Sequence, residues 1–152
     1  MKLDAIDAKL INLLQEDSKR TSKQLAILLH LSVTATYERI KKLEKEGIIT
    51  HYAAKVDPKK IDKSFLVFCQ VKLIQHSKEY LSVFESEISK LDEVSECFHI
   101  SGDYDYILKI YVKDMQEYRE FMVTKLTTIK HIGSTQSSFT IGEVKNSTKI
   151  TI

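Results

Sequence analysis

Residues 21–47 read TSKQLAILLHLSVTATYERIKKLEKEG, and this stretch decides how the first part of the chain folds. Thr21 is followed three residues later by Gln24, which is the spacing of a capping box at the start of a helix. A second helix begins after Ser32, a favourable N-cap, and ends at Gly47, a residue that tolerates the left-handed conformation after a helix. Only a short turn separates the two. The stretch therefore predicts a helix-turn-helix.

The second of these helices has two different faces. One face carries Val33, Thr36, Ile40 and Leu43 at helical spacing, and the remaining positions are mostly polar or cationic. In a helix-turn-helix protein, the first helix holds the second, whose N-terminal residues enter the major groove of DNA. The residues expected to contact double-stranded DNA, from their place at the start and on the open face of this helix, are Ser32, Thr34, Thr36, Tyr37, Arg39, Lys41 and Lys42. The alternative is a helical hairpin with a solvated face, because capping and periodicity are general helix features.

Charge is distributed unevenly along the chain. Residues 1–60 carry 12 Lys and Arg against 8 Asp and Glu, whereas residues 61–152 carry 11 against 13. The N-terminal part is therefore the better partner for a polyanion such as DNA. No apolar run is long enough to span a bilayer and no signal-peptide pattern opens the chain, so we expect a cytoplasmic protein without membrane contact.

The segments around the helix-turn-helix complete a first domain. Residues 3–15 have the apolar stripe of a helix, and residues 48–52 and 53–56 read as two short strands that would form a wing. The only proline of the chain lies in Asp57–Lys60 and marks the best domain boundary. The sequence thus predicts a winged helix-turn-helix domain with its linker over residues 1–60.

A different periodicity begins after the boundary and predicts a second domain over residues 61–152. The expected strands cover 64–74, 94–101, 105–113 and 132–141, and the expected helices cover 78–91 and 115–126. The order βαββαβ is that of a ferredoxin-like sheet, so the fold class is α+β. Two helices cover only one face of such a sheet, and the first strand is apolar on both sides. We therefore expect a second copy of the chain to cover the other face.

Motifs for catalysis are scarce in this sequence. It contains no glycine-rich nucleotide loop, no nucleophile elbow and no metalloprotease motif. Cys97 and His99 share a strand face and could form half a metal site or a Cys–His pair, but a core cysteine beside a partly buried histidine is the commoner arrangement. Cys69 and Cys97 are interpreted as reduced core thiols. We expect neither an enzyme nor a bound metal or cofactor.

The segment Ser101–Tyr106 combines a glycine, two aspartates and two tyrosines. One interpretation is a hairpin turn with polar tips, which Gly-Asp favours. The other is a cradle for a free amino acid, in which backbone N–H groups take the carboxylate, an aspartate takes the ammonium group and a ring contacts an apolar side chain. Both interpretations remain open at this point.

Several motifs together resemble the Lrp/AsnC (feast/famine) family of transcriptional regulators, most closely its leucine-responsive branch. The motifs are Asp4-Ala5-Ile6-Asp7, Leu13-Leu14, Leu31-Ser32, Gly47-Ile48-Ile49, Glu96-Cys97, the run from Ser101 to Lys109, Asp114-Met115, Tyr118-Arg119 and the run from Gly142 to Thr148. The resemblance covers nearly the whole chain. The sequence departs from the family at Val33, where a proline is frequent.

The resemblance implies a regulator whose assembly or DNA affinity is modulated by a small amino acid, with leucine or methionine as the first candidates. It also implies a homodimer, often assembled into octamers or larger rings, with the effector bound between dimers. The matching effector residues are Gly102, Asp103, Tyr104 and Asp105 in the turn, and Gly133, Ser134, Thr135 and Gln136 in the facing segment. The alternative function is an amino-acid-binding module without a regulatory role of its own.

Overall fold

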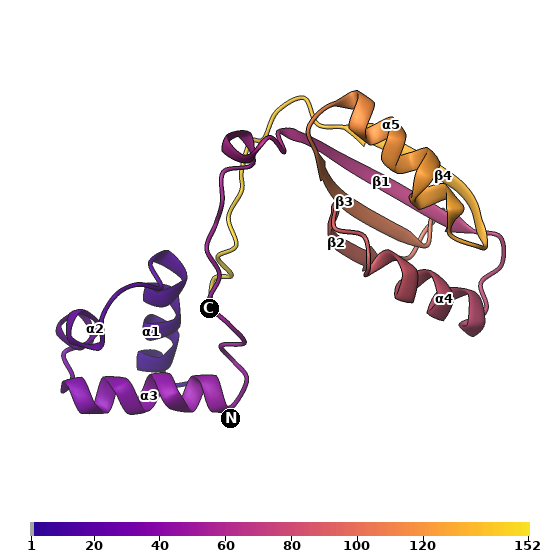
Figure 1. The fold of residues 1–152 in the computed structure, drawn as a ribbon. Coiled ribbons are helices and arrows are strands. Elements are labelled where there is room, and N and C mark those ends of the chain that lie inside the picture. The colour runs from indigo at the N-terminus through magenta and orange to yellow at the C-terminus, as the bar shows by residue number, and fades with distance from the viewer. Residues whose placement is uncertain (1) are drawn as a thin grey trace. The chain divides into compact units, whose positions relative to one another are not determined.

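The computed structural model describes residues 2–152 and divides into two compact units (Figure 1). The helical unit runs up to Lys55 and includes Val144–Ile152 from the far end of the chain, and the sheet unit is Val56–Glu143. The sequence-based boundary after residue 60 had placed residues 144–152 with the sheet. They group with the helices because Ile150 is hydrogen-bonded to Gln15 of the first helix and the Asn146 carbonyl accepts a hydrogen bond from Lys55.

The helical unit contains the three expected helices, α1 (Ala5–Glu16), α2 (Ser22–Leu29) and α3 (Val33–Lys45). Local sequence signals set their starts. Thr21 and Gln24 form the predicted capping box of α2, and the Ser32 hydroxyl accepts the Ala35 N–H at the start of α3. The turn between α2 and α3 passes through His30, which adopts a left-handed conformation with φ 55°.

Gly47 ends α3 with φ 70°, as the sequence predicts. The Gly47 N–H donates to the Glu44 carbonyl and the Ile48 N–H to the Leu43 carbonyl, both at 3.0 Å, which is the hydrogen-bond pattern of a Schellman motif. The three helices enclose a small apolar core made of Leu10, Ile11, Leu14, Leu25, Leu29 and Leu43.

The two strands expected at 48–52 and 53–56 do not form. This segment has no regular secondary structure, and most of its side chains are exposed. A strand needs a neighbouring strand for its backbone hydrogen bonds, and within the helical unit described here none is present. The Tyr52 hydroxyl instead donates to Glu44 on α3 at 3.0 Å.

The sheet unit has the predicted βαββαβ order, so the ferredoxin-like fold is confirmed. Short 3-10 helices at Pro58–Ile61 and Leu126–Thr128 accompany the main elements. The main elements are β1 (Phe65–Leu73), α4 (Lys78–Ile88), β2 (Val94–His99), β3 (Tyr106–Val112), α5 (Met115–Thr124) and β4 (Ile132–Phe139). The strands form one antiparallel sheet in the order β2-β3-β1-β4.

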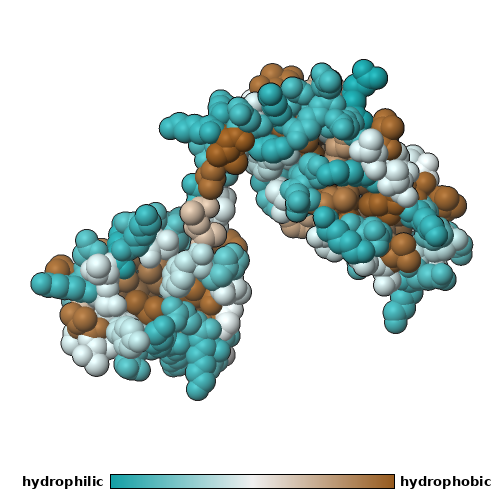
Figure 2. Space-filling model, viewed as in Figure 1, coloured by the Kyte–Doolittle hydropathy of each residue, from teal (hydrophilic) through white to brown (hydrophobic). Residues whose placement is uncertain are grey.

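Alternating side chains of β1 and β3 form the core of the sheet unit. Every second residue of β3 from Tyr106 to Val112 is fully buried, and they pack with Phe84 of α4 and Phe121 of α5. Both helices thus cover the same sheet face. On the opposite face Phe68 and Phe98 are 37% and 53% exposed. Figure 2 shows hydrophobic residues among hydrophilic ones on the surfaces of both units.

The two cysteines lie in different environments. Cys69 is buried in the sheet core, as expected, whereas Cys97 is exposed on β2 and is not a core thiol. The reason is the strand order, which places β2 at the edge of the sheet, where one side of the strand has no neighbouring strand. Within residues 2–152, no helix is both long and apolar enough to cross a membrane.

Candidate functional sites

The exposed surface of α3 is the first candidate site. Thr34, Tyr37 and Lys42 are solvent-accessible, and the Lys41 ammonium lies 5.7 Å from the centroid of the Tyr37 ring and 2.8 Å from Glu44. Because the exposed side of α3 thereby presents a hydroxyl, a ring and cations to solvent, it has the groups that contact bases and phosphates in a major groove.

Ser32 contributes twice at the start of α3. Its oxygen accepts the Ala35 N–H at 3.1 Å and so caps the helix. Its hydroxyl proton is not used in that bond and can be donated to a phosphate oxygen. Val33, expected on the apolar face, is 48% exposed beside it and adds an apolar group to the same surface.

Thr36 was expected to contact DNA, and the structure contradicts this. Thr36 is fully buried, and its hydroxyl donates to the Ser32 carbonyl at 3.0 Å. It lies on the side of α3 that packs into the helical core, so it cannot reach a ligand outside.

Arg39 also has a different role from the expected one. Its guanidinium donates to Asp4 at 2.8 Å and to Asp7 at 2.6 Å, and Asp7 is buried. The two carboxylates raise the pKa of Arg39. The pKa of Asp4 is lowered, first by the Asp7 N–H and then by Arg39. Arg39 therefore fastens α3 to the start of α1, and its charge is already compensated within the unit.

The turn between β2 and β3 is the second candidate site. Gly102 has φ 136°, a conformation that favours glycine, and a side chain there would meet no atom of this chain within 4 Å. Within one chain, Gly102 is therefore required by its backbone conformation and not by a lack of space for a side chain. The Asp105 N–H donates to the Val71 carbonyl at 2.9 Å, which ties the turn to β1.

Asp105 holds the turn in place. One carboxylate oxygen accepts the Leu73 N–H at 2.8 Å, and the other lies 3.0 Å from Nδ1 of His76. Burial opposes ionisation of Asp105, but these two hydrogen bonds outweigh it and lower its pKa. Asp103, by contrast, is exposed and has no hydrogen-bond partner among residues 2–152. Asp103 is thus the carboxylate that remains available to a ligand.

The two segments expected to bind an effector meet at Tyr104 and Gln136. The Tyr104 hydroxyl donates to Oε1 of Gln136 at 2.8 Å. Gln136 lies on β4, opposite Gln70 of β1, and Thr135 and Ser134 precede it along the same ladder. Gly133 allows close approach there, because a Cβ would stand 3.3 Å from the Ile74 backbone nitrogen.

His76 is a site residue that the sequence did not reveal. It lies 29 positions from Asp105 and belongs to no motif, so no local signal identifies it. Its ring also lies 5.7 Å from that of His99, which stacks on Tyr106. Within the described residues, no three His, Cys, Asp or Glu side chains are grouped as metal ligands.

Cys97 and His99 lie on the same face of β2, as predicted, beside a hollow of about 460 Å³ between β2 and α4. Although Cys97 as a residue is exposed, its thiol lies in this hollow, where burial and then the charge of Glu85 raise its pKa to about 11. A thiol with this pKa stays protonated at neutral pH and is a poor nucleophile. The hollow therefore offers no activated Cys–His pair.

Comparison with known proteins identifies the two domains in which the candidate sites lie. Residues 3–50 match the family model for winged helix-turn-helix DNA-binding domains, and residues 66–150 match the model for the Lrp/AsnC ligand-binding domain. The chain is therefore a helix-turn-helix transcriptional regulator that carries an amino-acid-binding domain. It belongs to the Lrp/AsnC family.

Curated relatives and solved structures agree along nearly the whole chain. The leucine-responsive regulatory protein of Haemophilus influenzae is 38% identical over 143 residues, covering 94% of this chain and 86% of the relative, and that of Escherichia coli is 35% identical over 150 residues, covering 99% and 92%. A Neisseria meningitidis transcriptional regulator in complex with L-methionine superimposes with a TM-score of 0.94 at 30% identity, covering 98% of this chain and 96% of that one. An AsnC family regulator from Agrobacterium tumefaciens has a TM-score of 0.92 at 34% identity, with coverage of 97% and 96%. All four are named as regulatory proteins or transcriptional regulators.

Proposed function

We propose that this chain acts as a homodimer that binds operator DNA through α3 and releases or retains it in response to free leucine or methionine. The observation that supports it best is the hydrogen bond between Tyr104 and Gln136, which brings the turn and β4 together beside an exposed aspartate. Relatives named for leucine and a similar structure with L-methionine make an apolar amino acid the first ligand to test. In this proposal residues 1–60 bind DNA, the protein acts in the cytoplasm, and it has no catalytic role.

The proposed DNA contacts come from the exposed part of α3. Ser32 and Thr34 donate to phosphates or base edges, and the Tyr37 ring contacts a base or a thymine methyl group. Lys41 and Lys42 neutralise phosphates. Arg39 and Thr36 support α3 from within and make no DNA contact.

The proposed effector contacts follow from the charges of a free amino acid. Its carboxylate accepts hydrogen bonds from backbone N–H groups between Gly102 and Tyr104, and its ammonium group pairs with Asp103. Tyr104 and Gln136 border the site, with the segment Gly133–Thr135 beside them. Asp105 positions the turn through Leu73 and His76 and is not a direct ligand.

The proposed dimer is formed through the sheet face that the helices leave open. Phe68, Phe98 and the half-buried Leu66 and Ile107 form an apolar patch on this face, beside the polar side chains of Gln70 and Lys109. A second copy of the chain would remove these side chains from water. The two α3 recognition helices of a dimer would then contact DNA half-sites about 34–36 Å apart or at a multiple of this spacing. We also propose that dimers assemble further into octamers or larger rings.

Calorimetric titration with leucine, methionine and the other amino acids tests the effector site. Asp103→Asn is expected to weaken binding, because the ammonium group would lose its charged partner. Asp105→Asn is expected to weaken it indirectly by loosening the turn. The control is Glu120→Gln, an exposed carboxylate on α5 whose side chain makes no contact in the described structure. Equal affinity in Asp103→Asn and the control would exclude Asp103, and no heat with any amino acid would refute the effector.

A further inference from the structure

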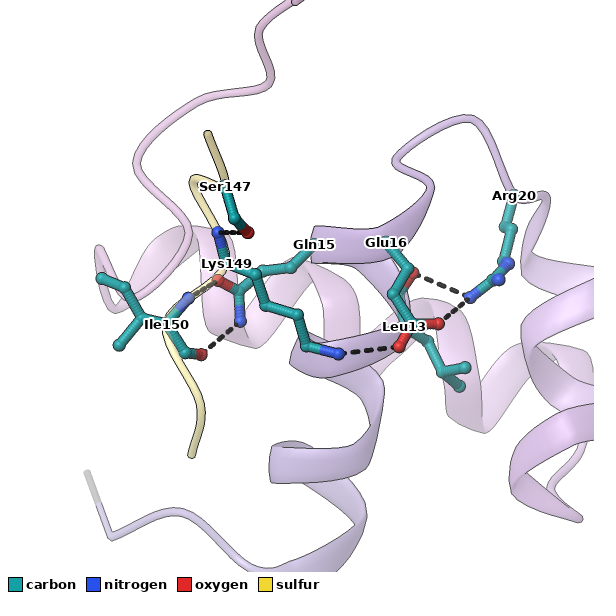
Figure 3. Close-up of polar contacts among 7 residues, drawn as sticks. All are labelled: Leu13, Gln15, Glu16, Arg20, Ser147, Lys149 and Ile150. Atoms are coloured by element: carbon teal, nitrogen blue, oxygen red, sulfur yellow. Dashed lines mark hydrogen bonds and ion pairs between the residues drawn. The ribbon is translucent and has the colours of Figure 1, made fainter. Parts of the chain in front are cut away.

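The end of the chain returns to the helical unit and binds the last turn of α1. The Gln15 side-chain amide donates from Nε2 to the Ile150 carbonyl at 2.8 Å, and its Oε1 accepts the Ile150 N–H at 2.7 Å. A single side chain thus makes both hydrogen bonds that a neighbouring β-strand would make to Ile150 (Figure 3). Because Gln15 bonds only to backbone atoms, it recognises an extended chain rather than a particular side chain.

An ion pair beside these hydrogen bonds fixes the register of the segment on α1. Nζ of Lys149 lies 2.7 Å from a carboxylate oxygen of Glu16, which also pairs with Arg20 at 3.5 Å (Figure 3). The hydrogen bond and charge of Lys149 are the main cause of the lowered pKa of Glu16. Earlier in the segment, Lys55 donates to the Asn146 carbonyl. Recognition therefore needs an extended backbone with a cationic residue directly before the residue held by Gln15.

Few apolar contacts reinforce the attachment. Ile150 is 75% exposed and Val144 is fully exposed, and no residue of the segment belongs to the helical core. The contacts that Gln15 and Glu16 make with the segment are hydrogen bonds and the exposed ion pair with Lys149, and water competes for both. The segment Val144–Ile152 is therefore held in a way that permits release.

We propose that Gln15 and Glu16 form a docking site for the chain's own segment Val144–Ile152, and that this docking couples the effector-binding sheet to the DNA-binding helices. This inference rests on the proposed function. The chain leaves the helical unit after Lys55 and re-enters it at Val144. While the segment is docked, two stretches of chain therefore connect the helical unit to the sheet unit. When it is released, only the stretch after Lys55 connects them. β4, which carries Gly133 and Gln136, ends at Phe139, and only residues 140–143 separate it from the segment.

The docking site is also connected to α3, the proposed recognition helix, through the packing of α1 against α3. α1 shares the helical core with α3 through Leu10, Leu14 and Leu43, and Arg39 joins the start of α1 to α3. A segment that holds the end of α1 therefore acts on the element against which α3 is packed. A change at the effector turn and β4 can reach α3 along this covalent and packed path.

The double variant Gln15→Ala/Lys149→Ala tests this coupling in the full chain. Alanine preserves the helix at position 15, and the change removes both hydrogen bonds to Ile150 and the ion pair. The control is Lys145→Ala, which removes the same charge from the same segment at a side chain without a contact in the described structure. The first measurement is amide hydrogen exchange at Ile150, and the second is the ratio of DNA affinities with and without leucine or methionine.

In the double variant, exchange at Ile150 should become at least about tenfold faster, because its protection depends on Gln15. DNA affinity without amino acid should stay within about twofold of wild type, while the affinity ratio with and without amino acid should fall to about a third of the wild-type ratio or less. Lys145→Ala should behave as wild type in both measurements.

Two outcomes in the double variant would overturn the coupling but leave the proposed function standing. One is unchanged exchange at Ile150 in the double variant, and the other is a wild-type affinity ratio in a double variant whose Ile150 amide exchanges freely. A loss of response in Lys145→Ala as large as in the double variant would also contradict it. A wild type whose DNA affinity responds to no amino acid refutes the proposed function and the coupling together, so the two failures are distinguishable.

Discussion

The guanidinium of Arg39 links two helices of the helical unit, at 2.8 Å from Asp4 and 2.6 Å from Asp7. Asp7 is 5% exposed, so its carboxylate depends on this partner more than Asp4 does. Removal of Arg39 would leave a buried carboxylate without a cation. A residue that reads as a DNA contact by its charge is thus a determinant of stability.

Arg39→Ala should lower the free energy of unfolding at pH 7 by about 1–3 kcal/mol, because the Asp7 carboxylate would be left without its charged hydrogen-bond donor. The pKa of Asp4 is depressed in the folded state, so its pairing stabilises the fold above the unfolded pKa of about 4 and is lost as pH falls through the folded pKa. The difference between variant and wild type should therefore shrink at pH 3.

Urea denaturation at pH 7 and pH 3 measures this effect. The matched control is Lys23→Ala, a cation on α2 whose side chain makes no contact in the described structure. An Arg39→Ala variant that is as stable as wild type but binds DNA much more weakly would instead indicate that Arg39 contacts DNA.

At the scale of elements, α3 combines a buried and an exposed side within 13 residues. Lys41→Ala and Lys42→Ala together should weaken DNA binding and reduce the slope of log K against log salt by about one unit for each phosphate that is no longer neutralised. Lys45→Ala, at the far end of α3, is the matched control for charge. Gel shifts over a salt series give the slope. If the double variant and the control change the slope equally, Lys41 and Lys42 do not contact phosphates in the proposed way.

At the scale of the whole molecule, the open sheet face predicts self-association. Phe68→Lys should shift the protein from dimer towards monomer in sedimentation at micromolar concentration, because a charge would be buried without a partner in the apolar contact. Val123→Lys is the matched control, because Val123 is 71% exposed on α5, which covers the other sheet face. A monomeric wild type, or an equal shift in both variants, would exclude this face as the dimer contact.

Much of this protein follows from its sequence, because the relevant signals are local. The capping box of Thr21 and Gln24, the Gly47 helix end and the alternation in β1 and β3 depend on residues a few positions apart. The family motifs are also short runs of neighbouring residues, so the fold class and the function could be predicted from them. The turn at Gly102 could also be predicted from the sequence, because glycine adopts a positive φ readily.

Tertiary structure decided which side chains remain available. Thr36 is buried and Arg39 is paired because of how α3 packs on α1, and a helical period alone does not fix that orientation. Asp105 is held by His76, and Gln15 holds Ile150 from a distance of 135 positions in the chain. Such partners meet only when separate elements pack together, and the geometry of packing depends on the whole set of core side chains rather than on any local pattern.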